Sequence, residues 1–122
     1  MLVNSPSKPV RIQSFNVSCE VGGTYYVLYT CPANCRAEVS MLLITNVTGT
    51  TQAIDCIWND VSKAHAPHIL GAKSLGNGDF VLFTGATLVL EAGDSIQVKA
   101  GTNGIVHVDA MCTVTETFIP VG

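Results

Sequence analysis

The sequence predicts an all-β fold, an antiparallel and jelly-roll-like β-sandwich of about eight or nine strands, with a closed barrel as the alternative architecture. Two observations favour this fold class. Apolar and polar residues alternate with a period of two along much of the chain, and turn residues recur about every ten positions. A long helix is not expected, because Pro67 interrupts the best helical candidate, residues 60–70.

The first expected strand contains a change of phase. Its apolar residues fall on even positions at Val10 and Ile12, and on odd positions from Phe15 onward. An extra residue in a strand reverses the direction of all the side chains that follow it. The sequence therefore predicts a β-bulge near Gln13 and Ser14.

The remaining strands follow in order along the chain. Residues 25–29 and 38–44 are rich in aromatic and β-branched side chains, which favour strands. Apolar residues alternate with polar ones in residues 54–58 and 96–100, and most clearly in residues 106–118. The last of these segments predicts a long strand with one buried face.

Two Asn-Gly pairs mark chain reversals, at residues 77–78 and 103–104. Asparagine and glycine adopt positive φ angles at low cost. Both pairs therefore predict hairpin turns, each joining two strands that pair with one another.

Length and composition indicate one domain with a surface poor in charge. The chain has 122 residues, of which 48% are hydrophobic and 12% charged, and its formal net charge is −3. Because so few charges repel neighbouring copies, we expect self-association. Nine acidic against six basic residues argue against binding to nucleic acid, and neither a membrane span nor a signal peptide is expected. We expect a flexible N-terminal arm, residues 1–8, and one β-sandwich domain, residues 9–122.

The five cysteines are an odd number, so they cannot all pair within the chain. Cys19, Cys56 and Cys112 lie on the apolar phase of their strands, which predicts small buried side chains. Cys31 and Cys35 instead flank a Pro-Ala-Asn turn. The two are candidates for a disulfide with each other or for an interchain thiol, and the sequence leaves these alternatives open.

Three tyrosines, Tyr25, Tyr26 and Tyr29, are candidates for an interface or for contact with a glycan. Tyr25 and Tyr29 share a strand phase with Val27, so one face of this strand is expected to be apolar and aromatic. Packing in the core is the default interpretation of such a face.

Residues that could carry catalysis or bind a metal are sparse. His65 and His68 lie on either side of Pro67, and His107 is two residues from Asp109, without a nucleophile in a recognised motif. We therefore expect no enzymatic activity, no metal and no cofactor. A small cupin-like metalloenzyme that uses the three histidines is an alternative hypothesis.

Two stretches of turn and strand residues form a recognisable pattern. Residues 28–39 begin with Leu-Tyr-Thr-Cys-Pro-Ala, and residues 88–96 read Leu-x-Leu-x-x-Gly-Asp-x-Ile. This pattern resembles that of small bacteriophage virion proteins, which are capsid decoration (cement) or tail-associated β-sandwich proteins. The likeness covers about residues 24–118, and the two cysteines of the first stretch depart from it.

The resemblance implies a structural protein of the virion without catalysis. The role it favours is a capsid decoration protein that forms a homo-oligomer, with a trimer favoured, on the phage particle. Its partners would then be copies of itself and the major capsid protein or tail proteins, after assembly in the host cytoplasm. The alternatives are a tail- or collar-associated protein and a carbohydrate-binding module for host attachment.

Overall fold

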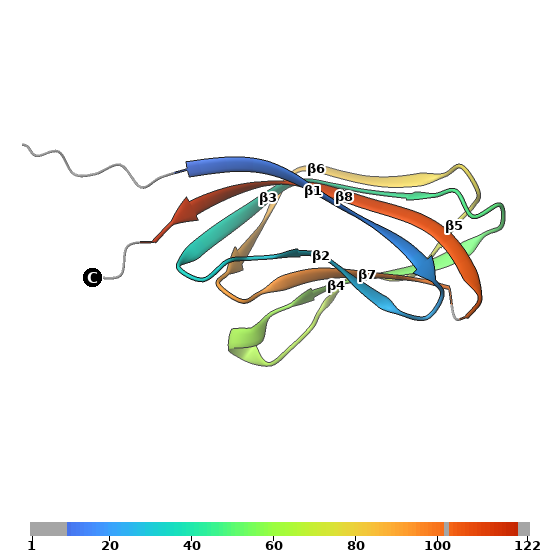
Figure 1. Ribbon diagram of the computed structural model, residues 1–122, viewed down its shortest axis with the longest axis horizontal. Coiled ribbons are helices and arrows are strands. Elements are labelled where there is room, and N and C mark those ends of the chain that lie inside the picture. The colour runs from blue at the N-terminus through green and yellow to red at the C-terminus, as the bar shows by residue number, and fades with distance from the viewer. Residues whose placement is uncertain (1–9, 102, 120–122) are drawn as a thin grey trace, which may run out of the picture.

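The predicted fold class is confirmed by the computed structural model, in which two four-stranded antiparallel sheets form a sandwich (Figure 1). The structure describes residues 10–101 and 103–119, so the arm predicted for residues 1–8 lies outside the described residues. The elements are β1 Val10–Val21, β2 Tyr25–Thr30, β3 Cys35–Asn46, β4 Gln52–Asn59, the 3-10 helix η1 Val61–Lys63, β5 His68–Leu75, β6 Phe80–Glu91, β7 Ser95–Ala100 and β8 Ile105–Phe118.

The strand order is that of a jelly roll. One sheet has the order β1-β8-β3-β6 and the other the order β2-β7-β4-β5. Consecutive strands lie in different sheets, with the exception of β4 and β5. This winding places β1 beside β8, so the first and last strands pair in one sheet.

The hairpins predicted at residues 77–78 and 103–104 are wrong. Both turns form, with Gly78 at a φ of 83° and Gly104 at a φ of 80°, but each turn passes from one sheet to the other. Turn residues determine that the chain reverses, whereas the sheet that the next strand joins depends on packing far from the turn. The consecutive strands that do pair are β4 and β5, joined through η1. In the described part of the chain, no helical segment has the length and apolar character of a membrane span.

The core lies between the two sheets and follows the predicted alternation. Along β8, the inward positions from Val106 to Val114 are all buried. The prediction that Cys19, Cys56 and Cys112 are buried is confirmed, since each is 0% exposed.

The bulge predicted near Gln13 and Ser14 is wrong. β1 pairs with β8 in one uninterrupted register from its first residue to Cys19, and the register shifts only after that position. Ile12 lies on the outer face of the sheet and is 70% exposed. Gln13 points inward, because its amide group donates a hydrogen bond to the buried Glu116. A polar residue thus occupies a position where the alternation required an apolar one.

Candidate functional site

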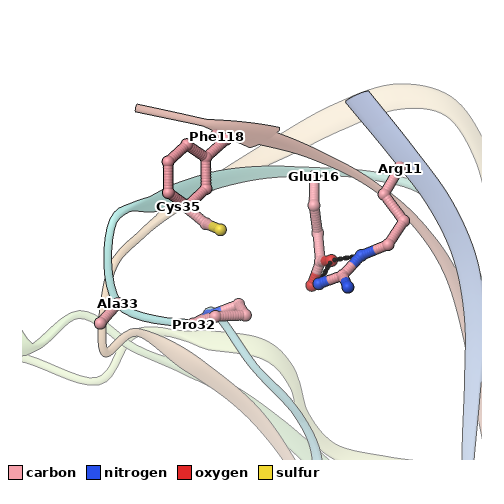
Figure 2. A pocket seen from close by; sticks show the side chains of 6 residues that line it. All are labelled: Arg11, Pro32, Ala33, Cys35, Glu116 and Phe118. Atoms are coloured by element: carbon pink, nitrogen blue, oxygen red, sulfur yellow. Dashed lines mark hydrogen bonds and ion pairs between the residues drawn. The ribbon is translucent and has the colours of Figure 1, made fainter. Parts of the chain in front are cut away.

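A buried carboxylate, Glu116 of β8, lies at the centre of a polar cluster near one end of the sandwich. Its side chain is 3% exposed, and Arg11 of β1 lies directly opposite in the register. Glu116 Oε1 accepts hydrogen bonds from Arg11 Nε at 2.8 Å and from Gln13 Nε2 at 3.2 Å. The hydroxyl group of Tyr29 in β2 donates to Glu116 Oε2 at 2.5 Å. Figure 2 shows the carboxylate and the guanidinium group facing one another.

The chemistry of this cluster is that of a structural link between strands. Burial raises the pKa of Tyr29 far above its ordinary value, and the hydrogen bond to Glu116 raises it further, so the phenol remains a donor. Burial also raises the pKa of the neighbouring Cys31 to about 11, which keeps its thiol protonated at neutral pH. Both oxygens of Glu116 are engaged, and the cluster joins β1, β2 and β8. The expectation that the chain is no enzyme stays a prediction.

A pocket of about 330 Å³ opens beside this cluster (Figure 2). It is lined by Arg11, Pro32, Ala33, Cys35, Glu116 and Phe118. Its two charged lining residues, Arg11 and Glu116, already pair with each other at 2.6 Å. The rest of the lining is mostly apolar, so the pocket offers contact area but no uncommitted charge.

The candidate thiols Cys31 and Cys35 are both free in the structure and both buried, at 1% and 7% exposed. The thiol of Cys31 lies 3.4 Å from the carbonyl oxygen of Cys35 and within 3.8 Å of that of Leu90, so it has backbone acceptors instead of a sulfur partner. A link to another chain through Cys31 would require this end of the sandwich to open, whereas Cys35 lines the pocket beside Glu116. The interchain pairing therefore stays a prediction.

Thiol counting tests the state of the cysteines. We expect all five to react with a thiol reagent in denaturant without reductant, because the structure records five free thiols. In the native protein we expect reaction to be slower by orders of magnitude, because each thiol is buried. Three reactive thiols in denaturant would instead show one disulfide.

The three candidate tyrosines do not form one exposed surface. Tyr29 is 3% exposed and packs against Phe15, with 4.7 Å between the ring centroids, so its assignment as a contact aromatic is corrected to a core position. A register shift between Val27 and Tyr29 breaks the phase that Tyr25 and Tyr29 were expected to share. Tyr25 and Tyr26 are half-buried, and contact of these two with a partner or glycan stays a prediction.

The three histidines of the alternative hypothesis, His65, His68 and His107, do not form a group of metal ligands in the described residues. In residues 10–101 and 103–119, the group of potential ligands that comes together is Asp60, Glu91 and Asp94, not the histidines. Asp94 is fully buried, and its carboxylate accepts hydrogen bonds from the backbone N–H groups of Val61 and Glu91 and from Trp58 Nε1. These bonds give Asp94 a structural role at the β6–β7 turn.

An apolar surface that the sequence did not reveal lies on the outer face of the β1-β8-β3-β6 sheet. Leu43 pairs with Met111 on one side and with Leu82 on the other, so the three side chains share this face. Phe80 lies on the same face, because it is two residues before Leu82 in β6. Phe80 and Leu82 are 61% and 49% exposed. We call these four residues the outer patch. Each is apolar in the sequence, but alternation alone does not tell which face of a sheet meets solvent.

Comparison with known proteins identifies the fold and not the family. No protein-family description matches the chain, and no curated protein does. Among solved structures, a chain of the Bacillus endospore appendages, described as a novel family of disulfide-linked pili, is similar with a TM-score of 0.57 and 9% identity. That alignment covers 98% of this chain and 97% of the other.

Two viral structures share the fold as well. A chain of the cyanophage Pam1 capsid has a TM-score of 0.52 at 14% identity, over 98% of this chain and 91% of the other. The VP2 subviral particle of infectious bursal disease virus has a TM-score of 0.55 at 10% identity, over 98% of this chain. The chain spans about a third of VP2, 35% of its length. At these identities the likeness establishes the jelly-roll class of fold.

Proposed function

We propose that this chain is a non-enzymatic structural subunit that assembles with copies of itself in a virion, where it acts as a capsid decoration protein. The observation that carries this proposal is the outer surface. Charged residues make up 12% of the chain, and the outer face of the β1-β8-β3-β6 sheet exposes Phe80, Leu82 and Ile12 by 49% to 70%. Apolar side chains exposed to this degree are typical of surfaces that other chains cover.

The shared fold supports the same assignment. Chains with this jelly roll occur in a cyanophage capsid and in the pili of Bacillus endospores. The sequence pattern of residues 28–39 and 88–96 resembles that of phage virion proteins, so it favours a role in a virion over a role in a pilus. A contact of some hundreds of Å² contributes about 25 cal/mol per Å² of apolar surface before association costs, and symmetry repeats this contribution for every copy in the assembly.

Light scattering and electron microscopy of the purified chain test the proposal. We expect a mass of at least twice the 12.8 kDa of one chain, and binding to capsids that lack the protein. The same mass tests the expected trimer. Because all five thiols are buried, we expect assembly to be unchanged by reductant. A monomer at every concentration that also fails to bind phage particles would overturn the proposal, and binding to isolated tails alone would assign the tail or collar instead.

A carbohydrate-binding module is the weaker candidate. Such a module needs aromatic rings on an accessible face, and here Tyr29 is buried while Lys99 Nζ lies 5.0 Å from the centre of the Tyr25 ring. A glycan array with the assembled protein separates the two candidates.

A further inference from the structure

One edge of the sandwich is open to a further strand. In the described part of the chain, β6 pairs with β3 alone and ends its sheet, so one side of its backbone lacks a partner strand (Figure 1). Monomeric β proteins protect such edges with charged side chains, prolines or short strands, because unpaired N–H and C=O groups attract another strand. From Phe80 to Leu90, β6 contains neither a charged residue nor a proline.

The exposed apolar part of this strand is the segment 80–84, which we call the β6 edge. Phe80, Leu82 and Phe83 are 61%, 49% and 38% exposed. β6 pairs with β3 without interruption from Phe80 to Thr84, and the register shifts after Thr84. The β6 edge is therefore a regular stretch of strand with which a further strand can pair.

The other three edge strands lack this combination of a neutral run with several exposed apolar side chains. The neutral run of β1, residues 12–19, is longer than the β6 edge, but apart from Ile12 its exposed side chains are polar, namely Ser14, Asn16 and Ser18. β1 carries Arg11 and Glu20, and β5 carries Lys73 and a left-handed residue, Ala72, at a φ of 51°. β2 has 6 residues and a register shift within them. The β6 edge is therefore the edge with the fewest of the features that prevent pairing with another strand.

We infer that the β6 edge pairs antiparallel with the β6 edge of a second copy, about a two-fold axis beside Leu82. The inference rests on the proposed function, which is assembly of the chain with copies of itself, and it specifies the β6 edge as one surface through which two copies bind. It places Phe80 opposite the partner's Thr84, Val81 opposite the partner's Phe83, and Leu82 opposite the partner's Leu82.

The β6 edge is complementary to itself in this register. No charged side chains face one another, and an apolar pair forms on each face of the joined sheet, Leu82 with its copy on the outer face and Val81 with the partner's Phe83 on the inner face. The pairing also covers Leu82 and joins the outer patches of the two copies. A two-fold contact of this kind closes on itself, so it can join trimers in a shell without excluding them.

Cysteine substitution at the axis tests the pairing. Directly opposite residues of an antiparallel pair have Cα atoms about 4.5–5.5 Å apart, which suits a disulfide. In Leu82→Cys under mild copper-catalysed air oxidation, we expect a disulfide-linked dimer to form on the order of tenfold faster than in the control Ile12→Cys. Ile12 is the matched control, because it is 70% exposed on the opposite edge strand of the same sheet. The native thiols are buried and compete little.

The register has its own test. We expect Phe80→Cys and Thr84→Cys to link in a mixture of the two variants, and each to link poorly alone. Equal rates for Leu82→Cys and Ile12→Cys would overturn the inference, as would preferential linkage between these two variants, which would show β6 paired with β1. A link that forms only after deletion of residues 1–9 would assign the β6 edge to that segment and overturn the inference.

A charged side chain at position 82 distinguishes a failure of this contact from a failure of the proposed assembly. We expect Leu82→Lys to halve the mass measured by light scattering, while Ile12→Lys leaves it unchanged. Both variants should keep the wild-type circular dichroism spectrum, which shows that they remain folded. If the wild-type chain assembles but Leu82→Lys has no effect, the contact is wrong and the proposed function stands. If the wild-type chain is a monomer at every concentration and also fails to bind phage particles, the proposed function fails.

Discussion

Raising the pH from about 8 to about 11 is expected to remove on the order of 10 kcal/mol from the free energy of unfolding. The cause is the set of buried thiols. Burial raises the pKa of Cys19, Cys31 and Cys112 to about 11 and that of Cys56 to about 12, from the ordinary value of 9.0. A loss of this size is comparable with the whole stability of a small domain.

The direction follows from proton binding. Below about pH 9 the thiols are protonated in both states, so they do not affect stability. Between about pH 9 and 11 the unfolded chain loses thiol protons that the folded protein keeps, so the unfolded state is favoured as the pH rises. The raised pKa of Tyr29 acts in the same direction above about pH 10.

Denaturant unfolding at a series of pH values measures this loss. We expect the midpoint to fall steadily above about pH 9, and to fall less steeply in Cys56→Ala, which lacks one titrating thiol, although that variant starts from a lower stability. A midpoint that stays level to pH 11, or native thiols that ionise near pH 9, would contradict the prediction.

Glu116→Ala is expected to lower the free energy of unfolding by about 3 kcal/mol. The substitution leaves the buried hydroxyl group of Tyr29 and the amide of Gln13 without their acceptor, and removes the partner of Arg11. Glu116→Gln retains an acceptor, so we expect it to lose less.

Two control variants define what the loss means. Arg11→Ala should cost less than Glu116→Ala, because Arg11 is 63% exposed and Glu116 keeps the hydrogen bonds from Gln13 and Tyr29. Glu20→Ala, which removes an exposed carboxylate from β1, should be within about 0.5 kcal/mol of the wild type. Denaturant midpoints with unchanged slopes are the measurement. A loss below 1 kcal/mol for Glu116→Ala would show that the cluster does not join the strands.

The cluster around Glu116 shows how far the sequence predicts a site. Glu116 lies on the apolar phase of residues 106–118, and this was the available signal for a buried carboxylate. Its partners could not be predicted, because Arg11 and Gln13 are more than a hundred residues away along the chain, with separations of 105 and 103. The phase change at Gln13 was visible, but without the pairing of β1 and β8 a bulge was the simpler interpretation.

The sequence by itself predicted six of the eight strands in the described residues, the inward faces of residues 15–19, 54–58, 96–100 and 106–118, and the places where the chain reverses. These features depend on the alternation and the backbone preferences of neighbouring residues. The sequence thereby predicted the burial of Cys19, Cys56 and Cys112. Only the tertiary structure decided that the Asn-Gly turns cross between sheets, that Arg11 meets Glu116, and that β6 forms an edge. Strand pairing joins segments that are far apart in the chain, and no property of one segment records which other strand lies beside it.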